Sequence, residues 1–214
     1  RNFTGAITLG WENLSLSNLT DALTPKGYKS VPENNFALGG TAQVSISRIV
    51  LGLEGAWLWG AGREAMVAGN TIKNSFSAFK AIGLIGFLVY TSERLDIFPY
   101  IGFGLAGYNL VMTNAQNDTF NNIVATGQRG AVLSSASLLM STGAQLTYRL
   151  PVIVADKGVF GLALGIKGGY DIAFVNSDWV SGGINDLIPV SGGPKTSLTG
   201  PYAQALIGIW FDFF

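Results

Sequence analysis

A two-residue alternation of large apolar and small or polar side chains constrains this sequence more than any other feature. Between Phe160 and Phe174 one phase is bulky and apolar, whereas the other holds Gly and Ala together with Lys167 and Asp171. Successive side chains of a β-strand point to opposite faces, so this pattern predicts strands with one apolar and one polar face. The same alternation recurs in residues 3–11, 36–47, 50–60 and 136–150. We therefore expect an all-β fold.

The charges lie on the small, polar face of these strands and not on the bulky one. A soluble barrel buries its apolar face inside, whereas a membrane barrel turns that face outwards to lipid. Charged residues are only 12% of the chain, about half of the ~25% usual in soluble domains. The longest apolar run, residues 81–90, falls short of the ~18 residues that a membrane-spanning helix needs. The sequence therefore predicts a barrel with an apolar exterior and a polar interior.

Strand-like segments and their connections predict the topology. The segments are residues 3–13, 34–47, 49–61, 74–91, 97–112, 133–150, 158–176 and 198–214. Long polar connections at 14–33, 62–73, 113–132 and 177–197 alternate with short turns. In outer-membrane barrels the short turns are periplasmic and the long loops extracellular. We predict one domain, residues 1–214: a closed, eight-stranded, antiparallel, up-and-down transmembrane β-barrel.

Two smaller points of the predicted topology depend on local sequence. Segment 74–91 is apolar in both phases, so no inward face can be assigned to it. Residues 17–23, which precede Pro25 in the first long loop, are expected to form a short helical turn.

Two stretches of the chain resemble a known family. Residues 98–108 (FPYIGFGLAGY) are similar to the Pro-Tyr-x-Gly-x-Gly strand opening of small OmpA/OmpX-type outer-membrane barrels. Residues 207–214 (IGIWFDFF) resemble the aromatic C-terminal strand signal that those proteins present to the barrel-insertion machinery. The resemblance implies an integral protein of the bacterial outer membrane, with Trp210, Phe211, Phe213 and Phe214 as its insertion signal.

The C-terminal stretch departs from the usual signal in one respect. If Phe214 faces lipid, Asp212 shares that face, whereas the phase from Ala203 to Phe213 is the cleaner apolar one. Either Phe214 lies outside the ladder of paired strands or the register shifts near the end.

Polar and charged residues of the inward phases are the candidate functional residues. They are Glu12, Gln43, Glu54, Gln145, Arg149, Lys167 and Asp171. Glu54 is on the third predicted strand and Lys167 on the seventh, so they face each other across an eight-stranded barrel that side chains can just fill. We hypothesise that they pair as an internal plug, because unpaired buried charge is costly. A wet interior without function and a gated pore are the alternatives.

Aromatic residues near the predicted strand ends are expected to form girdles at the two membrane interfaces. They are Trp11, Trp57, Trp59, Phe98, Tyr148, Phe174, Trp210 and Phe213. The alternative interpretation is ordinary lipid-facing bulk.

The absence of histidine and cysteine bears directly on function. Without them the chain has neither the usual general base near neutral pH nor a thiolate metal site. We expect no catalysis, no cofactor and no metal, and the zero net charge argues against nucleic-acid binding. The predicted function is a structural or accessory role in an outer-membrane assembly, in contact with lipid, lipopolysaccharide and other outer-membrane proteins. A narrow pore for ions or small solutes and a surface adhesin or receptor acting through the loops are the alternatives.

Overall fold

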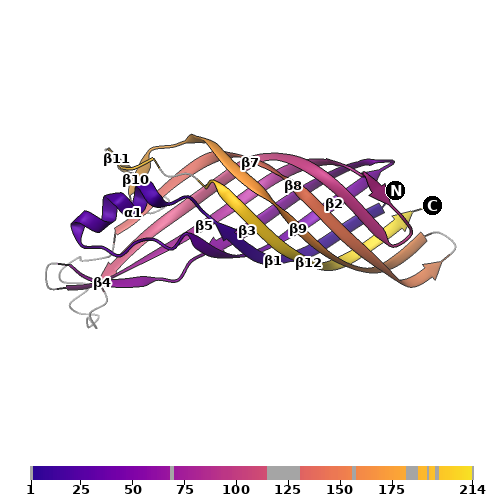
Figure 1. Ribbon diagram of the computed structural model, residues 1–214, viewed down its shortest axis with the longest axis horizontal. Helices are drawn as coiled ribbons and strands as arrows, with labels where there is room; N and C mark the ends of the chain where they lie inside the picture. Colours follow the sequence, from indigo (N-terminus) through magenta and orange to yellow (C-terminus); the bar gives the residue numbers. More distant parts are fainter. Residues whose placement is uncertain are drawn as a thin grey trace.

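The computed structural model describes residues 2–67, 70–114, 131–155, 158–181, 188–191, 193–195 and 198–213. Most of these residues are in β-strands (Figure 1). The strands are β1 (Asn2–Asn13), β2 (Asn34–Ile46), β3 (Ile49–Trp59), β4 (Arg63–Val67), β5 (Asn70–Phe87), β6 (Tyr90–Thr91), β7 (Leu95–Asn114), β8 (Ala131–Ala155), β9 (Gly158–Asn176), β10 (Trp179–Ser181), β11 (Ile188–Val190) and β12 (Gly200–Phe213). Two short helices, α1 (Ser17–Leu23) and the 3-10 helix η1 (Thr24–Lys26), follow β1. None of the described helices is long or apolar enough to cross a membrane.

The long strands pair with one another in a ring. Antiparallel pairing runs from β1 through β2, β3, β5, β7, β8 and β9 to β12. The last of these strands pairs with β1 again, from Asn2 opposite Asp212 to Glu12 opposite Tyr202. Each long strand therefore has a hydrogen-bonded neighbour on both sides, and the predicted all-β antiparallel fold is confirmed.

The described residues contain twelve strands, whereas the sequence predicts eight. The additional strands are short: β4 pairs with β5, β6 with β7, β10 with β8, and β11 with β10. Three of them lie in the predicted loops 62–73 and 177–197, where hairpins beyond the ring satisfy backbone groups that a loop would leave to water. The predicted strand 74–91 ends at Phe87 and resumes as β6, so it is wrong at its C-terminal end. The predicted helical turn is confirmed as α1.

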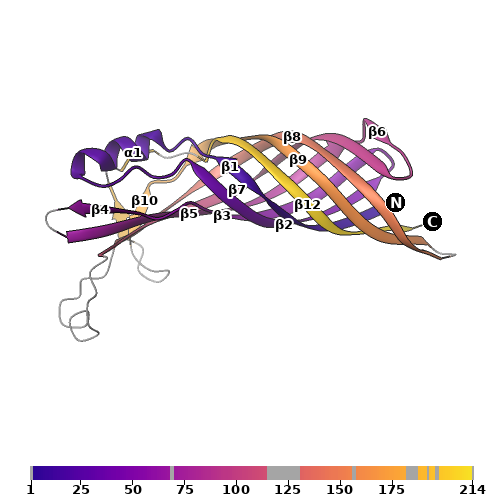
Figure 2. The same ribbon diagram turned by 60° about the horizontal axis from the view of Figure 1, so that its bottom comes forward.

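The two ends of the ring differ in what covers them. Helix α1 and strands β4, β10 and β11 gather at one end, which we call the loop end (Figures 1 and 2). Both termini lie at the opposite end, the turn end, with the β2–β3 and β6–β7 connections. The third predicted long loop lies almost wholly outside the described residues.

Side chains alternate between the inside and the outside of the ring as the sequence predicts. On β5, which had no predicted face, Phe76, Lys80 and Leu84 are buried inside. Two inward glycines allow neighbouring strands to approach closely. A Cβ atom on Gly104 would lie 1.9 Å from the carbonyl oxygen of Ala81, and one on Gly208 would lie 2.0 Å from that of Gly5. A side chain at either position would therefore push the strands apart.

Candidate functional site

The inside of the ring holds all of the polar residues that the sequence placed there. Their side chains are almost completely buried: Glu12, Gln43, Glu54, Gln145, Arg149, Lys167 and Asp171. Alternation along β1, β2, β3, β8 and β9 places them there, since each lies in the inward phase of its strand. They do not form one cluster, and the structure divides them into several groups along the barrel axis.

An ion-pair triad around Lys80 is the group nearest the loop end. The Lys80 Nζ atom donates to Glu12 Oε2 at 2.7 Å and to Asp171 Oδ2 at 2.5 Å. The three side chains come from β5, β1 and β9 and are each exposed by 3% or less. The Lys80 ammonium also lies 4.5 Å from the centre of the Tyr202 ring, a cation–π distance. One cation therefore holds two buried carboxylates together.

A second ion pair joins Lys167 on β9 to Glu54 on β3. The Lys167 Nζ atom donates to Glu54 Oε2, and both side chains are buried. The ammonium lies 5.0 Å from the centre of the Tyr100 ring. The structure thus brings together the two residues that the sequence placed on opposite strands. Their charges cancel within the interior, which lowers the cost of burying each one.

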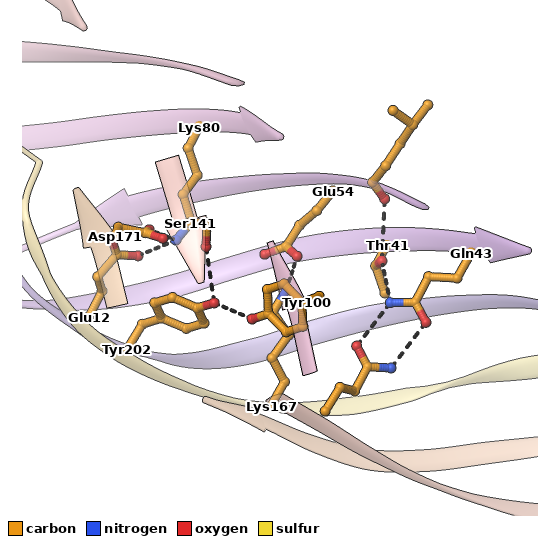
Figure 3. Close-up of polar contacts among 12 residues, drawn as sticks. Glu12, Thr41, Gln43, Glu54, Lys80, Tyr100, Ser141, Lys167, Asp171 and Tyr202 are labelled. Atoms are coloured by element: carbon orange, nitrogen blue, oxygen red, sulfur yellow. Dashed lines mark hydrogen bonds and ion pairs between the residues drawn. The ribbon is translucent and has the colours of Figure 1, made fainter. Parts of the chain in front are cut away.

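A hydrogen-bonded group of hydroxyls lies between the triad and the Lys167–Glu54 pair. The hydroxyl groups of Tyr100 and Tyr202 are hydrogen-bonded, and Tyr202 also shares a hydrogen bond of 3.1 Å with the Ser141 hydroxyl. Figure 3 shows the two tyrosines lying between the Lys80 triad and the Lys167–Glu54 pair. We call the triad, the pair and these hydroxyl groups the central polar layer.

An amide pair continues the polar contacts beside the central polar layer. The Gln43 amide nitrogen donates to Gln145 Oε1 at 2.9 Å, and Gln145 returns a hydrogen bond of 3.1 Å to Gln43 Oε1. Each amide also donates to a threonine hydroxyl on its own strand, Thr41 and Thr147. Strands β2 and β8 carry the two glutamines, so this reciprocal pair ties distant walls of the barrel together.

Arg149 is separate from the other predicted residues and lies near the turn end. Its Nη2 atom donates to Asp96 Oδ1 at 3.0 Å and to the Ser92 carbonyl oxygen at 2.6 Å. Its guanidinium group is 5.3 Å from the centre of the Trp210 ring. Arg149 therefore anchors the β6–β7 hairpin at its turn.

Apolar side chains fill the interior at the loop end. This loop-end plug comprises Leu14, Leu16, Leu19, Leu23, Val31, Ala37, Leu58, Phe76, Ala78, Ile82, Ala106, Tyr108, Leu110, Leu139, Trp179 and Leu198. It combines inward residues of the long strands with residues from α1 and β10. The first long connection thus folds back over the barrel mouth and covers it.

The predicted aromatic girdle is only partly on the outside. Five of its members have exposed rings on the outer face: Trp11, Trp57, Trp59, Tyr148 and Phe174. The prediction is wrong for Phe98 and Trp210, whose side chains are buried inside. Phe98 shares the inward phase of Asp96 and Tyr100, and Trp210 shares that of Tyr202. Whether an aromatic side chain points into or out of the ring therefore depends on its position in the two-residue alternation and not on its aromatic character. The side chain of Phe213 lies outside the described residues.

The C-terminal strand resolves the question of phase raised by Asp212. The outward face of β12 includes Ala203, Ile207 and Ile209, which is the cleaner apolar phase, and Asp212 belongs to the inward phase. Phe211 packs against Phe160 on the neighbouring strand, with ring centres 4.7 Å apart. Phe214, the last residue of the predicted insertion signal, lies outside the described residues.

Sequence reasoning missed three residues that organise the interior: Lys80, Tyr100 and Tyr202. Lys80 is the only charged residue between positions 74 and 90. An isolated lysine on an apolar strand is expected to face a polar interior, so this signal was available and identifies the inward phase of β5. The tyrosines carried no comparable signal, because an aromatic residue suits either face of a membrane barrel.

Metal binding finds no support in the described part of the chain, where no group of three or more acidic, His or Cys side chains is placed to hold an ion. The buried carboxylates of the central polar layer are instead held by lysines.

Comparison with known proteins gives a likeness in structure and none in sequence. Neither a protein-family model nor a curated protein matches the sequence. Among solved structures, the crystal structure of Ail, the attachment invasion locus protein of Yersinia pestis, aligns with a TM-score of 0.45 and 10% sequence identity. The alignment covers 99% of this chain and 97% of that chain.

Proposed function

We propose that this protein is a non-enzymatic integral barrel of the bacterial outer membrane, with its long strands spanning the lipid and its loop end outside the cell. One observation carries the proposal: the ring is inverted relative to a soluble protein. Large apolar side chains such as Leu53, Ile166 and Ile207 are 59–69% exposed on the outside, while charges are buried inside. Such a surface is unfavourable in water and favourable in lipid.

The filled interior supports a structural or accessory role in an envelope assembly. Apolar packing at the loop end and ion pairs in the middle occupy the space through which a solute would pass. The partners in this role are outer-membrane lipid, lipopolysaccharide and other outer-membrane proteins. The aromatic C-terminal strand, similar to that of OmpA/OmpX-type barrels, would engage the insertion machinery during biogenesis.

Catalysis is not part of the proposal. The sequence has no histidine, and the carboxylates that could replace one as a base are engaged with Lys80 and Lys167. A general base must be free to accept a proton from a substrate.

A narrow pore is the second candidate function, and specific atoms favour it. The Thr8 hydroxyl and both polar atoms of the Gln204 amide are buried without a hydrogen-bond partner. Gln204 is opposite Lys167 in the β9–β12 register. Buried polar atoms of this kind are commonly satisfied by internal water, and connected internal water could carry ions.

Single-channel conductance in a planar bilayer distinguishes the two functions. The purified wild-type protein and the Lys167→Met variant are measured side by side, after folding and insertion have been verified. If the filled interior has a structural or accessory role, we expect no steady current from the wild type. A steady, ion-selective current that changes in Lys167→Met would overturn it in favour of the pore. Fractionation of cell envelopes tests the location. Recovery of the protein in the inner-membrane or the soluble fraction would contradict the proposed outer-membrane location.

A further inference from the structure

A small apolar cavity opens at the loop end, between α1 and the β10–β11 hairpin. Its volume is about 300 Å³, and its walls include Leu19, Tyr28, Met112, Leu133, Trp179 and Val190. The walls therefore come from the first long connection, from the loop-end parts of β7 and β8, and from the fourth long connection. Ligand pockets in proteins are typically concave and mostly apolar, and their volumes start at about 300 Å³.

The cavity is a gap in the loop-end plug and not a part of its packed core. Tyr28, Met112, Leu133 and Val190 pack against the plug but remain only partly buried, and all four line the cavity. Apolar side chains left uncovered are unfavourable in water in proportion to their exposed area. An apolar occupant would recover this free energy.

Hydrogen bonds and close packing hold the cavity in shape. The Trp179 indole nitrogen donates to the Pro194 carbonyl oxygen at 2.7 Å, and the Asn18 amide donates to the Lys195 carbonyl oxygen at 3.2 Å. The second contact connects α1 with the opposite wall. Gly193 lies so close to the Trp179 ring that a Cβ atom there would be 2.3 Å from it. The cavity is therefore largely formed before any ligand arrives, which reduces the entropic cost of binding.

One charge accompanies this apolar lining. Lys26, in η1, is the only charged residue among those that line the cavity. Its side chain is exposed, and it makes no ion pair within the described part of the chain. A lysine at the rim of an apolar cavity complements a ligand with an apolar body and an anionic head.

We propose that the loop-end cavity binds a single-chain anionic amphiphile, with its alkyl chain between α1 and the β10–β11 hairpin and its carboxylate beside Lys26. At ~30 Å³ for each water-sized group, a cavity of about 300 Å³ holds an alkyl chain of roughly ten carbons. This binding site goes beyond the proposed envelope role, and it does not depend on whether the barrel conducts ions.

The three methionines of the chain allow a sharp test by methyl NMR. Met112 lines the cavity, Met66 is exposed on β4, and Met140 is on β8 in the outward phase. The protein, carrying ¹³C-methyl methionine, is placed in phospholipid nanodiscs and titrated with decanoate. We expect a saturable shift of the Met112 signal. Met66 should not move, and Met140 should report only non-saturable partitioning of decanoate into the bilayer.

Two variants and one control locate the occupant. Ala22→Phe places a ring in the cavity from α1 and should weaken decanoate binding by at least tenfold. Lys26→Gln removes the charge and should weaken it by about fivefold, the usual limit for one exposed ion pair. Lys29→Gln removes an exposed lysine that does not line the cavity and should leave binding unchanged. Unchanged Met66 and Met140 signals show that each variant is folded.

The outcomes that would overturn the proposal are equally specific. A Met112 signal that does not shift, or that shifts only in proportion to Met140, means that decanoate enters the bilayer and not the cavity. An equal response to decyltrimethylammonium refutes recognition of an anionic head. Full binding by Ala22→Phe places the ligand elsewhere on the protein.

Discussion

The central polar layer and the loop-end plug fill the same barrel in two different ways. In the layer, two lysines and three carboxylates are buried in ion pairs: Glu12, Glu54, Lys80, Lys167 and Asp171. In the plug, apolar side chains such as Phe76, Leu110 and Trp179 pack without a net charge. The layer depends on complete pairing, because a single missing partner leaves a buried charge. The plug depends on volume, and it should tolerate exchanges that preserve volume.

The largest expected effect comes from breaking the triad in the central polar layer. Lys80→Met leaves the Glu12 and Asp171 carboxylates buried, close together and without their cation. We expect the free energy of unfolding to fall by about 3–5 kcal/mol, measured by urea unfolding in lipid vesicles with tryptophan fluorescence. Adding Glu12→Gln and Asp171→Asn should restore most of that loss. A Lys80→Met variant as stable as the wild type would show that Lys80 does not stabilise the buried Glu12 and Asp171 carboxylates.

A cavity in the loop-end plug should cost somewhat less. Leu110→Ala removes a fully buried side chain from β7, and we expect a loss of about 3 kcal/mol in the same unfolding assay. Leu110→Met, which preserves volume, should lose less than about 1.5 kcal/mol. Equal losses for the two variants would mean that shape, and not volume, determines stability in the plug.

The Gln43–Gln145 amide pair tests the same comparison between polar and apolar filling, with an effect of intermediate size. Gln43→Leu leaves the Gln145 amide buried without its main partner and should cost about 1–3 kcal/mol. The double variant Gln43→Leu with Gln145→Leu replaces both polar groups by apolar ones and should be more stable than the single variant. A double variant that loses the sum of the two single losses would contradict the proposed coupling between β2 and β8.

The smallest effect is expected at the rim of the loop-end plug. Asn18→Ala removes the exposed hydrogen bond from α1 to the Lys195 carbonyl oxygen and should lower global stability by only about 0.5 kcal/mol. Its effect should be local, as faster hydrogen exchange in the amides of α1. A loss as large as that of Leu110→Ala would show that α1 is essential for the plug.

Much of the fold was predictable because alternation is a local property of sequence. The phase that buries Glu12, Glu54 and Asp171 was evident from bulky residues on either side of each. The Glu54–Lys167 contact also followed, since strand order and position along the strand place the two residues opposite each other.

The remaining features depend on information that alternation does not contain. Segment 74–91 is apolar in both phases because its inner face contributes Phe76, Ile82 and Leu84 to apolar packing, and this concealed the face of Lys80. Their position near the strand ends and their aromatic character favour the outside for Phe98 and Trp210, whereas the two-residue alternation places both inside. Strands β4, β10 and β11 form in polar segments, where hairpin pairing and not an apolar pattern decides the structure.

Closure of the ring determines how another polypeptide can attach to this protein. The eight strands of the ring each have a neighbour on both sides along most of their length, so the wall offers no edge for an incoming strand. In the described part of the chain, β4 pairs only with β5, β6 only with β7, and β11 only with β10. A partner that binds by strand addition therefore finds its edges at these three short strands. Any contact made elsewhere on the ring has to be made through side chains.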